Sequence, residues 1–341
     1  MMKKIKIEDA IGTVLGHDVT QIIPGQFKGP KFKRGHLIRE EDIPEFLKIG
    51  KEHVYVMDVK AGVIHEDDAA LRLGKAFSGK NIKISGPSEG KVTFHSKING
   101  LLKINLPLLH RINLSRNIIL STLHRYTPCF PGMAVGATRI ISLTAPERQI
   151  EKMENWREKY GPAIEILPYR MLNVGVVVTG NEFFHGRTED RFNDRVGKKI
   201  VGFGSRVAKK LVVPDDIRQI SNALSKLEDE PVDLILVTGG LSVDPDDVTR
   251  AGIKKAGTRI IFYGTPILPG AMFLYGKLGE KPVLGLPACV FYHNATLFDI
   301  IFPRILAGEV LNRREISLLG HGGFCSNCDP CHFPICPFGK G

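Results

Sequence analysis

Four apolar stretches that alternate with helical ones constrain the fold of the C-terminal half of the chain most strongly. The apolar stretches are Leu172 to Val178, Asp233 to Val237, Arg259 to Tyr263 and Pro282 to Leu286. Helical patterns lie between and after them, at 194–211, 215–227, 246–256 and 291–306. Strands without a polar face need cover on both sides. The pattern therefore predicts an α/β domain, a three-layer sandwich with a mainly parallel sheet.

The sequence pattern outside this region differs from one stretch to the next, so the chain is expected to consist of several structural segments. The predicted segments are a small N-terminal α+β region at 1–75, a β-rich module at 76–145, a helical linker at 146–171, the α/β domain at 172–311 and a cysteine-rich tail at 312–341. Alternation at Lys91 to Phe94 and turn signals such as Asn99-Gly100 predict that 80–143 is entirely β.

The charge of the chain narrows the class of partner. The 341 residues hold 47 Lys and Arg against 36 Asp and Glu, a formal net charge of +11. Such an excess fits nucleic acid, an anionic membrane surface or a phosphorylated small molecule. The basic residues are scattered, and no nucleic-acid-binding motif accompanies them, so no nucleic acid partner is expected. No stretch approaches ~20 apolar residues and no signal-peptide core follows the N-terminus, so we expect a cytoplasmic protein without membrane contact.

Ligands of an open parallel sheet bind beyond the carboxyl ends of its strands. The segments that follow the predicted strands are Thr179 to Glu182, Thr238 to Asp247, Gly264 to Gly270 and Pro287 to Cys289. All four should lie at the same edge of the sheet. Three of them combine glycine with hydroxyl residues, and two carry acids.

The second of these segments has the composition of a phosphate-binding loop. Gly239 and Gly240 let the backbone approach an anion closely, and a helix N-terminus follows. Thr238 and Ser242 add hydroxyl donors. The alternative is a tight strand-to-helix turn with no ligand.

Acidic residues in the same segments would disfavour the binding of an anion. Glu182, Asp244, Asp246 and Asp247 would repel a bare phosphate. They fit a phosphate or oxyanion that is bound through Mg²⁺, which prefers hard oxygen ligands. The alternative is that Asp246 and Asp247 cap the following helix.

The ordered set of these motifs resembles the molybdenum cofactor biosynthesis domain, which occurs in molybdopterin adenylyltransferases and molybdopterin molybdenumtransferases (insertases). The motifs are Thr179-Gly180-Asn181-Glu182, Thr238 to Val243 with Asp247, Pro269-Gly270, and Gly285-Leu286-Pro287. The resemblance covers about residues 172–310 and implies a three-layer α/β sandwich that binds molybdopterin or its adenylylated form. Residues 10–15 and 33–38 resemble the insertase pattern more loosely.

The resemblance also implies roles for single residues. Glu182 and Asp247 would match the catalytic acids of the family, and Asp244 with Asp247 would hold the divalent cation that insertases use to transfer molybdate onto the pterin dithiolene. The positions that would bind the pterin are Thr179, Gly180, Thr238, Gly239, Gly240, Ser242, Pro269, Gly270, Gly285 and Pro287.

Three departures from the family pattern leave the activity open. Asn181 stands where the family usually has Asp, Ala271-Met272 where insertases have Lys-Pro, and Ala288-Cys289-Val290 where they have Gly-Asn-Pro. A lost cation weakens the stabilisation of developing negative charge. The chain is therefore expected to be either an insertase-like transferase or a non-catalytic carrier or sensor of molybdopterin. A nucleotide pyrophosphatase, which uses a related domain, is a third alternative.

The C-terminal tail carries four closely spaced cysteines: Cys325, Cys328, Cys331 and Cys336. Four thiolates at this spacing can hold Zn²⁺ or an iron–sulfur cluster. The alternative is an unstructured, redox-sensitive tail. Gly320 to Gly323 suggests a hinge, which would let the tail fold separately. A molybdoenzyme that receives the cofactor is a further expected partner, and the chain is expected to form a homo-oligomer.

Overall fold

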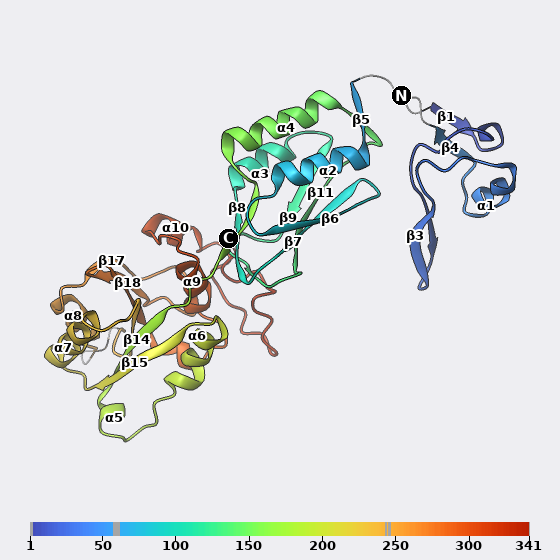
Figure 1. The fold of residues 1–341 in the computed structure, drawn as a ribbon. Coiled ribbons are helices and arrows are strands. Elements are labelled where there is room, and N and C mark those ends of the chain that lie inside the picture. The colour runs from blue at the N-terminus through green and yellow to red at the C-terminus, as the bar shows by residue number, and fades with distance from the viewer. Residues whose placement is uncertain (1–2, 57–61, 243, 245–246, 341) are drawn as a thin grey trace. The chain divides into compact units, whose positions relative to one another are not determined.

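The computed structural model describes residues 3–56, 62–242, 244 and 247–340 (Figure 1). The chain forms two compact units. The first consists of Met1–Ile98, Lys103–Leu123 and Phe130–Ile166, and the second of Asn99–Leu102, His124–Cys129 and Leu167–Gly341.

The N-terminal part of the first unit is a small α+β arrangement, as predicted for this region. Its elements are β1 (Lys3–Lys6), η1 (Glu8–Ala10), β2 (Val19–Ile23), β3 (Phe27–Phe32), η2 (Glu40–Asp42), α1 (Ile43–Lys48) and β4 (His53–Val56). β1 pairs with β4, and β2 with β3, both antiparallel. The rings of Phe32 and Phe46 stack at 4.0 Å inside an apolar core that includes Ile7 and Leu15.

The rest of the first unit combines a four-stranded antiparallel sheet with helices. The elements from here to the start of the second unit's main sheet are β5 (Val63–His65), α2 (Glu66–Phe77), β6 (Ile82–Ser88), β7 (Lys91–Ser96), β8 (Gly100–Ile104), α3 (Leu106–Asn113), β9 (Ile118–Thr122), β10 (Pro128–Cys129), β11 (Ala134–Ile140), β12 (Thr144–Pro146), α4 (Glu147–Tyr160) and β13 (Ile164–Pro168). The sheet order is β6-β7-β11-β9. Helix α2 packs on α4, where Arg72 contacts Glu147 at 2.6 Å and Glu154 at 2.7 Å.

Helix α3 corrects the prediction that residues 80–143 are entirely β. The Asn105 side chain accepts a hydrogen bond from the backbone N–H of Leu108 at 3.2 Å and so caps the helix. Pro107 lies in the first turn, where a missing N–H costs nothing. These local signals outweigh the alternating pattern on either side.

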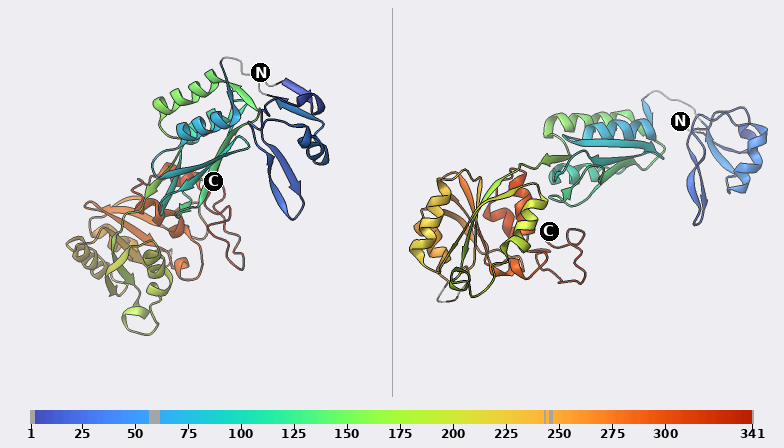
Figure 2. Two further views of the ribbon diagram at one scale, coloured as in Figure 1. Left: turned by 45° about the vertical axis from the view of Figure 1, so that its right-hand side comes forward. Right: turned by 60° about the horizontal axis from the view of Figure 1, so that its bottom comes forward.

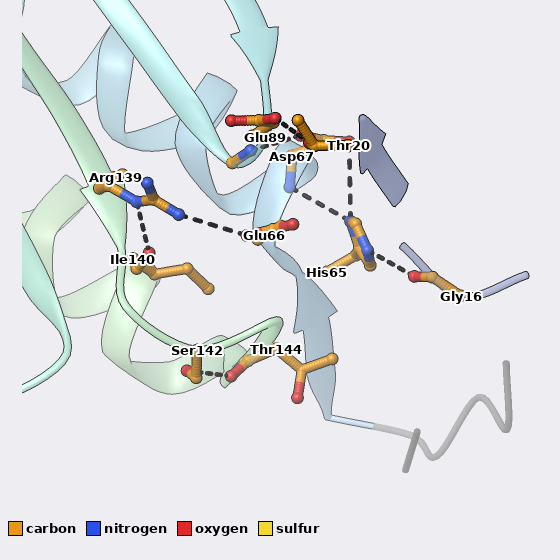
Figure 3. Close-up of polar contacts among 11 residues, drawn as sticks. Gly16, Thr20, His65, Glu66, Asp67, Glu89, Arg139, Ile140, Ser142 and Thr144 are labelled. Carbon is orange, nitrogen blue, oxygen red and sulfur yellow. Dashed lines mark hydrogen bonds and ion pairs between the residues drawn. The ribbon is translucent and has the colours of Figure 1, made fainter. Parts of the chain in front are cut away.

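A buried carboxylate lies at the start of α2 (Figure 3). Glu66 is 6% exposed, and its carboxylate occupies the space beside Gly90 that a side chain there would fill. Burial raises the pKa of Glu66, and Asp67 adds to the rise, whereas the Arg139 guanidinium at 3.9 Å opposes it. Glu66 therefore has a packing role in the first unit.

The second unit is built around a six-stranded sheet. Its elements after β13 are β14 (Asn173–Thr179), α5 (Asn181–Phe184), η3 (Asn193–Gly197), α6 (Lys198–Gly202), β15 (Arg206–Val213), α7 (Ile217–Glu228), β16 (Leu234–Thr238), α8 (Thr249–Lys255), β17 (Arg259–Tyr263), β18 (Leu274–Leu278), β19 (Lys281–Leu286), η4 (Ala288–Phe291), α9 (Leu297–Leu306) and α10 (Arg313–Leu318). The strand order is β15-β14-β16-β19-β18-β17.

The sheet is mixed, because one strand, β18, runs against the other five described strands. β14 pairs in parallel with β15 and β16, and β16 with β19. β18 is antiparallel to both β17 and β19. Strand β18 was missed because Leu274 to Leu278 is a short hairpin partner without a distinct pattern of its own.

Alternate residues of the strands belong to two separate apolar clusters, one on each face of the sheet. Val176 and Leu236 pack with residues of α6 and α9, such as Ile200 and Phe302. Val177 and Val237 pack with residues of α7 and α8, as part of the second cluster. Figure 2 shows helices on both sides of this sheet. The α/β class predicted for the segment is therefore correct.

The stretch 194–211, predicted as one helix, contains two short helices and then the edge strand β15. The π-helical turn η3 and helix α6 end at Gly202, after which Gly204 adopts a φ of +81°. The following Arg206–Val213 pairs along the whole length of β14. Three glycines break the helical pattern, and long-range pairing with β14 decides the strand.

The cysteine-rich tail is not a separate knob. Phe338 is 3% exposed and belongs to the same core cluster as Phe302, and Cys331 and Cys336 pack against that cluster. The Gly320 to Gly323 segment does not act as a hinge, since Leu268 donates a backbone hydrogen bond to Gly323 and accepts one from Cys325, each at 2.8 Å. Apolar burial fixes the tail on the α/β unit.

Candidate functional site

The carboxyl ends of four parallel strands lie in register at one edge of the sheet. Thr179 at the end of β14 pairs with Val213, and Thr238 at the end of β16 pairs with Leu286. The chain between β17 and β18 reaches the same edge, because β18 runs antiparallel to β19 and begins at that edge, where β17 ends. The four sequence motifs therefore meet at one edge, as expected for loops that follow such strands.

Three threonines lie behind the glycine loop at this edge. The Thr179 hydroxyl donates to the Thr238 carbonyl at 3.1 Å and is 2.9 Å from the Thr249 hydroxyl. All three residues are buried. The Thr238 hydroxyl is also shielded from solvent and has no hydrogen-bond partner in the described part of the chain. Thr249, the first residue of α8, is absent from the sequence-based site because its role depends on the contact with β14.

Close packing requires the two glycines of the loop. Gly239 has a φ of +93°, and a Cβ there would lie 2.4 Å from the Thr179 carbonyl oxygen. Gly240 has a φ of +53°, and a Cβ there would lie 2.5 Å from the Thr249 hydroxyl. Both positions need glycine for conformation and for space.

The same loop presents unpaired backbone donors. Thr249 donates its backbone N–H to the Gly240 carbonyl at 3.2 Å, which ties the loop to the start of α8. Within the described residues, the backbone N–H groups of Gly239, Gly240 and Leu241 donate no hydrogen bond. Successive free N–H groups in a turn form a concavity that binds anions. This is the geometry expected of a phosphate loop.

The hydroxyl and acids that follow the glycines lie on the surface. Ser242 and Asp244 are exposed, and Asp247 is half-buried, with its backbone N–H bonded to the Asp244 carbonyl at 3.0 Å. Val243, Pro245 and Asp246 lie outside the described residues, and the predicted helix cap at Asp246 lies outside them as well. Helix α8 begins at Thr249, three residues after the expected start.

A further acid, Asp215, joins the first loop from the strand that the sequence did not predict. Asn181 donates its backbone N–H to the Asp215 carboxylate at 2.9 Å, and its side-chain oxygen accepts from the Asp215 N–H at 3.3 Å. Glu182 is exposed on α5 beside this pair. Asp216, one residue later, caps α7 by accepting hydrogen bonds from the backbone N–H groups of Arg218 and Gln219.

The remaining motif residues have packing reasons of their own. A Cβ on Gly270 would lie 2.6 Å from the Cβ of Leu297, and one on Gly285 would lie 2.9 Å from the Cβ of Leu274. Pro269 accepts a backbone hydrogen bond from Leu297 at 3.2 Å. Pro287 precedes η4, which carries Cys289; burial raises the pKa of the Cys289 thiol.

Three of the four tail cysteines line one cavity of about 430 Å³. Cys325, Cys328 and Cys331 share it with His293, whose Nδ1 is 3.1 Å from the Asn327 side-chain oxygen. Cys336 does not line it. Across residues 3–56, 62–242, 244 and 247–340, no three or more His, Cys, Asp or Glu side chains are arranged to hold a metal ion. Neither the predicted Mg²⁺ ligands nor the cysteines form such a group.

Comparison with protein families identifies the α/β unit. Residues 175–307 match the probable molybdopterin binding domain. This part of the chain belongs to the molybdenum cofactor biosynthesis domain family. Residues 4–58 match a domain of unknown function (DUF8806). The expected likeness of the N-terminal region to insertases stays a prediction.

Curated relatives match the chain over limited lengths. The molybdopterin molybdenumtransferase of Haemophilus influenzae is 28% identical over 148 residues, which cover 41% of this chain and 36% of that protein. A CinA-like protein of Citrifermentans bemidjiense is 36% identical over 90 residues, which cover 26% of this chain and 22% of that protein. The chain thus spans about a third or less of these relatives.

Two solved structures are similar to the chain at lower sequence identity. A molybdopterin biosynthesis enzyme MoaB from Thermus thermophilus is 20% identical, with a TM-score of 0.34, covering 41% of this chain and 98% of that one. A molybdopterin biosynthesis MoeA protein from Pyrococcus horikoshii is 15% identical, with a TM-score of 0.33, covering 90% of this chain and 75% of that one. Separately, none of the helices in the described residues has the length and apolar character needed to span a membrane.

Proposed function

We propose that residues 172–311 bind molybdopterin or adenylylated molybdopterin, with a ligand phosphate on the Gly239-Gly240 loop. The observation that carries the proposal is the run of three backbone N–H groups from Gly239 to Leu241 that have no acceptor within the described residues, at the edge where the family motifs meet. Helices on both faces of the sheet fit the three-layer sandwich expected of the family. Ser242, exposed beside the glycines, would add a hydroxyl donor.

The acidic residues at the same edge would bind a divalent cation and orient the reacting groups. Glu182, Asp244 and Asp247 offer the hard oxygen ligands that suit Mg²⁺, and Asp215 adds a carboxylate beside Asn181. Bound there, Mg²⁺ would neutralise charge between the phosphate and an oxyanion such as molybdate. Glu182 and Asp247 would orient these groups for transfer of molybdate to the pterin dithiolene.

This proposal is tested by separating binding from transfer. Glu182→Gln and Asp247→Asn should lower the rate of molybdate transfer on the order of 100-fold, since each removes a charged group from the reacting site. Pterin binding, measured by fluorescence after oxidation, should weaken only a few-fold. Glu280→Gln is the matched control, because Glu280 is an exposed acid in the turn between β18 and β19, at the opposite edge. Transfer that persists in both variants would refute the catalytic roles.

A non-catalytic carrier or sensor is the second candidate. The loop at Ala288 and Cys289 lacks the residues that insertases have, and Cys289 is held half-buried with a raised pKa. A wild-type chain that binds molybdopterin and shows no turnover would favour this candidate, and turnover of ADP-ribose-like substrates would instead favour a pyrophosphatase. A cytoplasmic setting, a homo-oligomer and a molybdoenzyme that receives the cofactor belong to the same proposal.

A metal site at the tail cysteines is a separate proposal. Cys325, Cys328 and Cys331 already share a cavity with His293, so Zn²⁺ or an iron–sulfur cluster would need only local movement to gather the thiolates. Anaerobically purified protein should contain about one equivalent of zinc or of a cluster by mass spectrometry. Cys328→Ser should lower that content strongly, whereas Cys129→Ser, a buried thiol elsewhere in the chain, should not. Equal metal content in the two variants would contradict the site.

A further inference from the structure

A second cavity, of about 330 Å³, opens beside the first loop of the second unit. Its walls come from two segments far apart in the sequence: the stretch from α5 to η3, with Phe183, Arg191 and Arg195, and the end of η4, with Phe291 and Tyr292. None of these residues belongs to the phosphate loop or to the family motifs. The volume is within the range of pockets that hold small ligands.

The aromatic residues of this cavity are positioned by their surroundings. The Phe183 ring lies over Gly180, where a Cβ would be 2.6 Å from the ring. Phe183 and Phe291 are half-buried against the main apolar cluster. Tyr292, by contrast, is 80% exposed. Three rings around one opening, with one of them exposed to solvent, form a surface on which a planar ring can stack.

The two arginines supply an excess of positive charge. Within the described residues, neither the Arg191 nor the Arg195 guanidinium has a hydrogen-bond or ion-pair partner. The acidic residue in the lining is Glu189, and Asp190 next to it is engaged by Lys210 at 2.7 Å. The cavity therefore has two cations against one carboxylate, which favours an anionic ligand.

The backbone that carries Arg195 has an uncommon conformation. Residues Asn193–Gly197 form a π-helical turn that continues into α6. Such turns are rare and occur frequently at functional sites. A backbone hydrogen bond links the turn to Arg191: the Arg195 N–H donates to the Arg191 carbonyl at 3.2 Å. It brings both guanidinium groups to the same cavity.

We propose that this cavity binds the ring of a phosphorylated planar heteroaromatic compound, with the ring stacked on Tyr292 and its phosphate paired with Arg191 and Arg195. The cavity uses residues other than those of the Gly239-Gly240 loop, so the inference does not depend on the proposed function. A nucleotide and a phosphorylated pterin share the required chemistry. Bidentate arginine–phosphate pairing supplies affinity, and the aromatic surface selects for the ring.

The test is calorimetric titration of the full chain with two probes, AMP and a phosphorylated pterin, with ribose 5-phosphate as the ring-free control. At least one probe should bind in the micromolar range and ribose 5-phosphate much more weakly. Arg195→Ala should weaken probe binding about tenfold, and Tyr292→Ala about three- to tenfold. Arg187→Ala, an exposed arginine of the same segment outside the cavity, should leave binding unchanged. Both cavity residues are exposed, so melting temperatures should stay at the wild-type value.

Three outcomes would overturn the inference: no binding of either probe, equal binding of ribose 5-phosphate, or affinities unchanged in Arg195→Ala and Tyr292→Ala. Ser242→Ala separates this cavity from the phosphate loop. If probe binding depends on Tyr292 and Arg195 but not on Ser242, the cavity is an independent site. If it depends on all three, a single ligand spans the cavity and the loop. Loss confined to Ser242→Ala would refute the cavity and leave the phosphate loop standing.

Discussion

The Gly239-Gly240 loop and the Pro269-Gly270 turn lie at the same edge of the sheet, and close packing requires glycine in both, but only the first has the composition of a phosphate-binding loop. Gly239 and Gly240 leave successive backbone N–H groups without acceptors in the described residues. Gly270 instead fits against α9, where its missing side chain makes room for Leu297. A glycine that belongs to a ligand-binding motif can therefore be required by packing alone. The two roles differ in what a substitution should change, stability or affinity.

The largest effect is expected at the packing glycine. Gly270→Ala should destabilise the second unit by roughly 2–4 kcal/mol, because its φ is +134° and its Cβ would lie 2.6 Å from Leu297. Gly257→Ala is the control, since Gly257 also has a positive φ but open space around it, and should cost about 1 kcal/mol. Urea denaturation followed by circular dichroism measures both. Equal losses would mean that the contact with Leu297 contributes nothing.

A smaller effect, on affinity alone, is expected beside the donor glycines. Ser242→Ala should weaken binding of a phosphorylated pterin about two- to tenfold, which is the worth of one hydrogen bond. The free energy of unfolding should change by less than about 0.5 kcal/mol, because Ser242 is exposed. Calorimetric titration and denaturation of the same preparation measure the two quantities. A large loss of stability with unchanged affinity would reverse the assignment of roles at this edge.

The buried Glu66 and the exposed Glu182 form a second comparison, in which the smallest effect, a pH-dependent change in stability, is expected. Burial raises the pKa of Glu66, so its contribution to stability is complete below the unfolded pKa and is lost as the pH rises through the folded one. Glu66→Gln should therefore be more stable than the wild type near pH 7 and equal to it near pH 4. Glu182→Gln, at an exposed position, is the control and should change the melting temperature little. Thermal melts of both variants across this pH range provide the measurement, and parallel curves for Glu66→Gln and the wild type would contradict a raised pKa.

The site was predicted only where the sequence pattern is local. The strand ends at Thr179, Thr238 and Leu286 could be located because each follows an apolar run of five to seven residues. Asp215 and Thr249 could not, because each acquires its role from a contact with β14 or its loop. The aromatic cavity at Tyr292 was also missed, since its two walls are about 100 residues apart in the sequence and no spacing rule joins them.

The tail was predicted incorrectly for a related reason. Cysteine spacing is a local signal that indicates possible metal ligands, whereas the attachment of the tail depends on Phe338 entering a core built by α9 and the sheet. The glycines at 320–323 suggested freedom, but a backbone hydrogen-bond pair with Leu268 holds them in place. Composition describes what a segment can do, and packing decides whether it is free to do it.

The sequence by itself determined the α/β class of the second unit, the family to which residues 175–307 belong, and the segments that follow its strands, because apolar runs and glycine motifs are set by neighbouring residues. Only the tertiary structure decided the mixed sheet, the edge strand β15, the docked tail and the cavity beside Tyr292. These features depend on pairings between distant residues, whose free energy comes from burial and shape complementarity and leaves no local pattern in the chain.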